Sequence, residues 1–126
     1  MGFDLTVHLC LSLCPTTGKP FHYRTNPETG LLERCYDIPT ISVPENLREY
    51  LEGRGKHFHA YTDMFTENDQ SEIFVEQFLD KYPPWETVCA SNFYDESWTQ
   101  EDHLAFKSLL KWCAMQSVPF LVSWSF

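Results

Sequence analysis

Residues Thr99–Phe126, with the sequence TQEDHLAFKSLLKWCAMQSVPFLVSWSF, contain the clearest helix and strand signals in the chain. The pattern Thr99-x-x-Asp102 marks a helix start, because the two side chains can cap each other's backbone N–H groups. Apolar side chains then recur at helical spacing, at Phe106, Leu109, Leu110 and Cys113. After the helix, large apolar side chains occupy every second position, as in a strand, at Phe120, Val122, Trp124 and Phe126. This segment therefore predicts a helix followed by a strand.

The N-terminal third of the chain predicts three further strands. Every odd position of 3–13 is apolar and the even positions are polar or cysteine, so a long strand is expected there. Turn-forming residues fill 15–20 and 26–30. The strands predicted after these two turns are Phe21–Arg24 and Leu31–Tyr36. Together the three strands predict a meander.

The middle of the chain predicts one helix and one strand before the acidic segment begins. Ser42-x-x-Glu45 is a capping box, and the helix that it opens is expected to end at Gly53. A fourth strand is predicted over Lys56–Thr62. Its two histidines, His57 and His59, would lie on one face of that strand.

Two more helices complete the prediction. Asp69-x-x-Glu72 is expected to cap a helix that Pro83-Pro84 ends, and Trp85–Ala90 is expected to be a short helix. The order β-β-β-α-β-α-α-α-β predicts an α+β fold. We expect an antiparallel or mixed sheet of about five strands, with helices packed on one face, in a single globular domain over residues 1–126.

The charge of the chain is concentrated in one stretch. Residues 63–102 contain eleven acidic side chains and one basic side chain, Lys81, and so carry a charge of −10. The remaining residues contain seven acids and eight bases and sum to +1, which gives the net charge of −9. Because the same stretch is rich in aromatic residues, we expect an acidic face on apolar helices. A negative field of this kind attracts basic partners and repels nucleic acid.

The five cysteines favour a protein with reduced thiols. Their number is odd and no Cys-x-x-Cys is present, whereas secreted disulfide scaffolds usually contain an even number. With no signal-peptide pattern and no long apolar run, we expect an intracellular location, in the cytoplasm or nucleus, and no membrane association. We expect no cofactor. A zinc site at His8, Cys10, Cys14 and His22 is disfavoured, because Cys10 and Cys14 are roughly 13 Å apart along a strand.

The predicted function is protein binding through the acidic helical half. Aromatic residues interleaved with acids are typical of interface anchors inside a charged rim. The predicted protein-binding residues are Glu67, Asp69, Glu72, Glu76, Phe93, Tyr94, Asp95, Glu96 and Trp98. Trp98 has an alternative role, packing as a hydrophobic staple onto the last helix. Inhibitors, immunity proteins and small virus-encoded accessory factors belong to this general class.

The expected partner is a basic protein or a nucleic-acid-binding protein, with no direct contact to nucleic acid. In one alternative the acidic face acts as a nucleic-acid mimic that blocks a DNA-binding protein. We also consider a homodimer formed through an edge strand, with the strand ending at Phe126 as the candidate. The chain is predicted to be a binding protein rather than an enzyme, with no catalytic residue assigned.

A metal-dependent nuclease is the enzymatic alternative. His57 and His59 at i, i+2 on a strand are about 7 Å apart, within reach of one divalent ion. The segment His57-Phe58-His59 resembles the His-hydrophobe-His strand of the HUH endonucleases, which nick single-stranded DNA with a helical tyrosine. That resemblance implies metal binding by His57 and His59. No tyrosine of this chain has a lysine three positions on, so the Tyr-x-x-Lys motif usual in that family is missing.

Overall fold

Strand β6 (Phe120–Ser125) is the central strand of the sheet on which the body of the molecule is built. The computed structural model describes residues 4–52, 58–64 and 72–125. Strand β1 (Asp4–Leu9) pairs antiparallel with one side of β6, placing Val7 opposite Val122. Strand β5 (Glu72–Phe74) pairs antiparallel with the other side, placing Ile73 opposite the same valine. The predicted C-terminal strand is confirmed, but it is not an edge strand.

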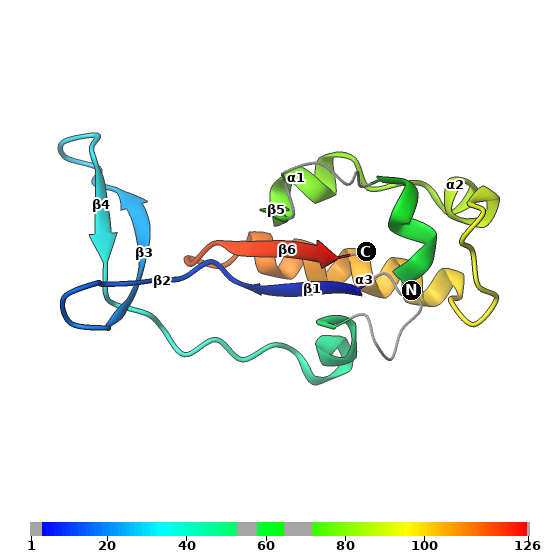
Figure 1. Ribbon diagram of the computed structural model, residues 1–126, viewed down its shortest axis with the longest axis horizontal. Coiled ribbons are helices and arrows are strands. Elements are labelled where there is room, and N and C mark those ends of the chain that lie inside the picture. Colours follow the sequence, from blue (N-terminus) through cyan, green and yellow to red (C-terminus); the bar gives the residue numbers. More distant parts are fainter. Residues whose placement is uncertain (1–3, 53–57, 65–71, 126) are drawn as a thin grey trace.

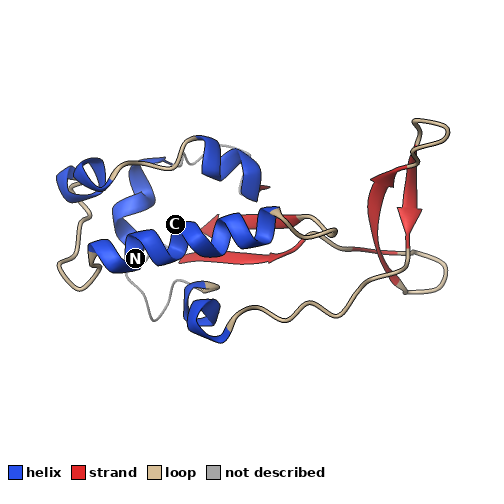
Figure 2. Ribbon diagram, turned by 180° about the vertical axis from the view of Figure 1, so that it is seen from behind, coloured by secondary structure: helices blue, strands red, loops and turns tan. Residues whose placement is uncertain are grey.

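Helix α3 (Gln100–Ala114) lies across one face of this sheet (Figure 2). Its predicted start is confirmed, since Asp102 N–H donates to Thr99 Oγ1 over 3.2 Å and Thr99 N–H donates to Asp102 Oδ2 over 3.0 Å. The predicted apolar stripe is also confirmed, because all four of its side chains are buried. The core therefore forms between α3 and the inward side chains of β1 and β6, among them Leu5 and Val122.

The remaining helical segments surround this core. They are α1 (Val75–Asp80), α2 (Trp85–Ala90) and two 3₁₀ helices, η1 (Glu45–Tyr50) and η3 (Phe58–Met64). Helix α2 matches its predicted bounds. The hydroxyl of Tyr50 on η1 donates to Asp102 Oδ1 over 2.7 Å, which ties η1 to the start of α3.

The long strand predicted over residues 3–13 is two strands, β1 and β2 (Ser12–Leu13). The pairing of β1 with β6 ends at Leu9 opposite Phe120, and Cys10 N–H then donates to the carbonyl of Pro119. Proline has no N–H with which to continue the ladder. The chain leaves the sheet at this point and enters a second one.

The second sheet has the order β2-β3-β4, with β3 at Pro20–Thr25 and β4 at Leu32–Cys35. We call residues 12–36 the arm, because in Figures 1 and 2 they stand apart from the sheet and helices of the body. The meander prediction is confirmed for these strands, which pair antiparallel. The expectation of one sheet of about five strands is wrong: the described strands form two antiparallel sheets of three strands each.

The strand predicted over Lys56–Thr62 is also wrong where the structure describes it. Residues 58–64 form η3, whereas 56 and 57 lie outside the described residues. Both Phe58 and Tyr61 are fully buried. Residues three apart share a face in a helix and point to opposite faces in a strand. Packing of both rings into the core thus favours the helix.

Two predicted helix starts are misplaced. Glu72 lies in β5, and α1 begins at Val75 after Phe74, whose N–H donates to Gln77 Oε1 over 2.8 Å; Asp69 is outside the described residues. Residues 72–74 form a strand because they pair antiparallel with the side of β6 that β1 does not cover. Segment η1 has Pro44 as its N-cap and no side-chain cap bond, so Ser42 does not cap it.

Candidate functional site

The described part of the acidic segment exposes seven carboxylates on the body. We call these the acidic surface: Glu72, Glu76, Asp80, Glu86, Asp95, Glu96 and Glu101. They lie on β5, α1, α2, the loop of residues 91–99 and the first turn of α3, all away from the arm (Figure 1). Among the described residues, no salt bridge joins Glu72, Glu76, Glu86 or Glu96 to a base. Asp102 does not belong to this surface, since it accepts hydrogen bonds from Tyr50 and Thr99.

The structure divides the predicted protein-binding residues into two groups. Glu72 and Glu76 flank Phe74, an aromatic side chain that is 45% exposed and that the sequence reasoning did not select. We call residues Glu72, Phe74, Glu76 and Asp80 the β5–α1 patch. The second group is the loop of residues 91–99, in which Phe93 is 48% exposed and Glu96 is also exposed. Glu67 and Asp69 lie outside the described residues.

Internal hydrogen bonds hold the loop of residues 91–99 in shape. Asp95 Oδ1 accepts from the N–H and the hydroxyl of Ser97 over 2.8 and 2.7 Å. The N–H of Phe93 donates to Ser91 Oγ over 3.2 Å. Tyr94 is half-buried, with its ring 5.8 Å from that of Trp85. These hydrogen bonds fix the conformation of the loop that exposes Phe93 and Glu96. Asp95 is one of the residues that accept them.

Trp98 is a core residue and not a surface anchor. Its side chain is 1% exposed, its ring lies 4.9 Å from that of Phe58, and its Nε1–H donates to the hydroxyl of Tyr61 over 3.1 Å. The Phe106 ring of α3 lies 6.3 Å away. Trp98 therefore packs onto the last helix, which is its alternative predicted role. It is not an exposed anchor for a partner.

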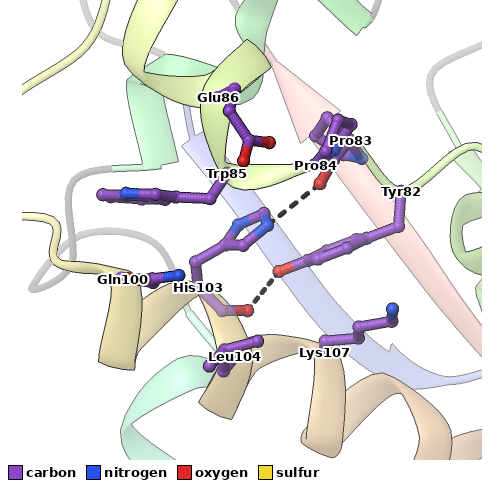
Figure 3. Close-up of a pocket in the computed structure, with 9 residues that line it drawn as sticks. All are labelled: Tyr82, Pro83, Pro84, Trp85, Glu86, Gln100, His103, Leu104 and Lys107. Carbon is purple, nitrogen blue, oxygen red and sulfur yellow. Dashed lines mark hydrogen bonds between the residues drawn. The ribbon is translucent and has the colours of Figure 1, made fainter.

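A cavity of about 360 Å³ lies between α3 and the segment that joins α1 to α2 (Figure 3). Trp85 and Glu86 approach it from α2, whereas His103 and Leu104 approach it from α3. Glu86 belongs to both the acidic surface and the cavity wall. The Tyr82-Pro83-Pro84-Trp85 run is a sequence signal for this site, although its prolines by themselves predict only a helix end.

The hydrogen bonds of His103 define its tautomer. Its Nε2 lies 2.9 Å from the carbonyl of Pro83, which can only accept, so Nε2 carries the proton. Its Nδ1 lies 2.7 Å from the hydroxyl of Tyr61 and therefore accepts from it. The hydroxyl of Tyr82 donates to the backbone carbonyl of His103 over 2.6 Å (Figure 3).

This network keeps its members neutral. Burial lowers the pKa of His103, and the nearby charge of Lys107 lowers it further, against the Pro83 hydrogen bond that raises it. Burial raises the pKa of the Tyr61 and Tyr82 hydroxyls above their ordinary value. Both ring nitrogens of His103 are already bonded to protein atoms. The arrangement is therefore suited to holding α3 against the Tyr82–Trp85 segment, and the cavity is suited to receiving a side chain.

The histidine and cysteine candidates are not brought together as a metal centre. His59 lies on a 3₁₀ helix and His57 is outside the described residues, so the strand geometry expected for a nuclease is not observed. His8 is engaged with Ser123 Oγ at 2.6 Å, whereas Cys14 and His22 lie in the arm. Over residues 4–52, 58–64 and 72–125, no group of three or more His, Cys, Asp or Glu side chains is placed to hold one metal ion.

The thiol of Cys14 in the arm is acidified by its surroundings. Hydrogen bonding by the Thr17 side chain, with further hydrogen bonds from the backbone at Thr17 and Thr16 and from Tyr36, lowers its pKa to about 6. Arg34 Nη1 donates to Cys14 Sγ over 3.8 Å. Burial has the opposite effect in the body, where it raises the pKa of Cys113 to about 12.

Comparison with known proteins yields no relative: no protein-family model, no curated protein and no solved structure matches this chain. Within the described residues, no helix has the length and apolar character needed to cross a membrane.

Proposed function

We propose that this protein is a binding module that captures a basic protein through its acidic surface. The observation that carries the proposal is the exposure of seven carboxylates beside two exposed aromatic side chains, Phe74 and Phe93. Exposed carboxylates increase the rate of encounter with a cationic partner, and desolvated aromatic anchors supply most of the binding free energy. The proposal assigns both tasks to the helical half of the chain.

The cavity beside Glu86 is the proposed place for one anchoring side chain of the partner. Its aromatic wall, which includes Trp85 and Tyr82, suits an apolar or aromatic group, and the single carboxylate of its lining, Glu86, can pair with a neighbouring lysine or arginine of the partner. The loop of residues 91–99 precedes α3 and contacts the cavity residue Trp85 through Tyr94, and it adds Phe93 and Glu96. The lining also contains Lys107, so the negative field that favours a basic protein comes from the surrounding acidic surface and not from the cavity itself.

The proposed partners are cationic proteins, including nucleic-acid-binding proteins whose binding groove the acids would occupy in place of phosphates. Direct binding of nucleic acid is disfavoured by the net charge of −9. We place this activity inside the cell, in the cytoplasm or nucleus. All five cysteines are free thiols, which is compatible with a reducing compartment.

Charge reversal tests the proposal. The triple variant Glu72→Lys, Glu76→Lys and Glu96→Lys should lose partners that the wild-type protein captures from host extract, as identified by mass spectrometry. The matched control reverses three exposed acids elsewhere, Asp4→Lys, Glu28→Lys and Glu45→Lys, with the same change in net charge. Capture of the same basic proteins by the triple variant and by wild type would contradict the proposal.

Competition with DNA tests the mimic form of the same function. If the captured partner binds DNA, duplex DNA should displace it from the immobilised protein, because both ligands would occupy one basic groove. Formation of a stable ternary complex with DNA would show that the acids do not imitate phosphates, while leaving partner capture itself intact.

A further inference from the structure

The arm exposes an unusual share of the apolar surface of the molecule. Over the described residues, ten large apolar side chains are exposed, and five of them lie in the arm. They are Leu13, Tyr23, Leu31, Leu32 and Tyr36. The three leucines are 68–69% exposed. Apolar surface gathered on one projecting element is typical of an interaction site.

The two faces of the arm sheet differ in their surroundings. His22, Arg24 and Cys35 share a face that turns toward the body, because together with Ser117 they line a cavity of about 330 Å³. Tyr23 and Leu32 belong to the opposite face, since side chains alternate along a strand and Tyr23 pairs with Arg34, and Thr25 with Leu32. We call Tyr23, Leu32, Arg34 and Tyr36 the outer arm face.

Arg34 lies at the centre of the outer arm face, where it also donates to Cys14 Sγ. The guanidinium of Arg34 lies 4.8 Å from the centre of the Phe21 ring, and the rings of Tyr23 and Tyr36 lie 5.3 and 5.4 Å from the same ring. Glu33 is on the other face, where it pairs with Arg24 at 3.6 Å. The outer arm face thus combines tyrosine, leucine and arginine with no carboxylate from β3 or β4.

Charge separates the arm from the rest of the chain. Residues 12–36 contain three bases and two acids and carry +1. The other residues carry −10, and the two parts sum to the net charge of −9. The β5–α1 patch has the complementary chemistry, with exposed Phe74 between the carboxylates of Glu72 and Glu76. In both overall views the arm and β5–α1 lie well apart within one chain (Figures 1 and 2). They can meet only between two copies.

We propose that the chain forms a homodimer in which the outer arm face of each copy docks on the β5–α1 patch of the other. Each copy contributes one outer arm face and one β5–α1 patch, so a two-fold axis relates the two copies. Both arm–patch contacts are then buried in a closed dimer. Stacking of two outer arm faces on each other is disfavoured, because it would bring the two Arg34 side chains together. This dimer covers the β5–α1 patch, which is part of the acidic surface, so dimerisation and the proposed capture of a basic protein compete for Glu72, Phe74 and Glu76. The loop of residues 91–99 and the cavity beside Glu86 stay open to a partner in the dimer.

Sedimentation equilibrium of the full chain tests the dimer. Wild type should approach twice its mass of 14.8 kDa as its concentration rises through the micromolar range, and added salt should shift it toward monomer. The variant Tyr23→Ser with Leu32→Ser changes only exposed side chains and should be a folded monomer by circular dichroism. Glu45→Arg, on η1, is the control that should remain dimeric. A monomeric wild type at every concentration would overturn the proposal.

A charge swap tests the pairing itself. Arg34→Glu and Glu76→Arg should each be monomeric, because like charges then face each other at both contacts. Mixing the two variants should restore the dimer mass, since each arm then meets a patch of opposite sign. A mixture that stays monomeric would overturn the reciprocal arrangement. The Tyr23/Leu32 variant retains every acid of the acidic surface, so its partner capture reports on the proposed function separately from dimerisation.

Discussion

His103 illustrates how hydrogen bonding determines the chemistry of a single residue. A histidine beside a cavity is a natural candidate for an acid or base. Here Nε2 donates to Pro83 and Nδ1 accepts from Tyr61, so neither nitrogen is available to a ligand. Protonation of Nδ1 would replace an acceptor with a donor and break the bond from Tyr61. The residue therefore links stability to pH.

We expect the free energy of unfolding to fall as the pH falls below about 6.5. The pKa of His103 is lowered in the folded state, so the unfolded chain takes up a proton near the ordinary pKa of 6.5 while the folded chain does not. The stabilisation by neutral His103 is complete above that pH and is lost below it. Urea unfolding of wild type and His103→Gln measures this. The stability difference between them should narrow from pH 7.5 to pH 5.5; a constant difference would contradict the prediction.

Cys14 should react as a thiolate at neutral pH. Its pKa of about 6 depends first on the hydrogen bond from the Thr17 side chain, which stabilises the charged form. The rate of alkylation of Cys14 by iodoacetamide, followed by peptide mass spectrometry, should have its midpoint near pH 6. Thr17→Ala should move that midpoint upward. Cys10, whose pKa is raised by burial, is the internal control, and a shared midpoint for the two cysteines would contradict the prediction.

Among the elements, α3 is the one whose local signals and tertiary contacts agree. Thr99 caps it, Asp102 bonds both Thr99 and Tyr50, and its apolar stripe covers the sheet. Segments η1 and η3 show the opposite case, in which short segments adopt 3₁₀ geometry because burial of particular side chains outweighs local propensity. The Ser42 capping pattern has no cap bond in the structure.

Capping variants test this contrast. Thr99→Ala should lower the free energy of unfolding by about 1 kcal/mol, because the N–H of Asp102 loses its acceptor. Ser42→Ala is the matched control and should change stability by much less, since Ser42 makes no cap bond at η1. Urea denaturation at pH 7.5 measures both variants. Equal losses at the two sites would show that the Ser42 pattern does cap a helix in solution.

The whole molecule is an acidic body with an arm of low net charge at one end. Exposed charges interact over about 8–10 Å at physiological ionic strength, so the acidic surface acts as a collective field. Partner capture that depends on it should weaken steeply between low and physiological salt. Titration of the identified partner at several salt concentrations checks this by isothermal calorimetry. Affinity that does not change with salt would indicate an apolar interface instead.

The amino-acid order alone was sufficient for α2, α3, β6 and the arm strands β3 and β4. Caps, turns and apolar periodicity in these segments act over a few residues, and the tertiary contacts agree with them. It was also sufficient for the concentration of charge in residues 63–102, which no folding event can alter.

Long-range packing settled the rest. Strand β6 is central because it pairs with both β1 and β5. The pairing with β5 makes residues 72–74 a strand where a helix start was expected. The strands of the arm form a separate sheet. Trp98 and Phe93 are both aromatic residues in one acidic loop. Trp98 is buried by its contacts with Phe58 and Tyr61, whereas Phe93 is exposed. Such choices depend on surfaces that meet from distant parts of the chain, and no local pattern encodes which surface will be available.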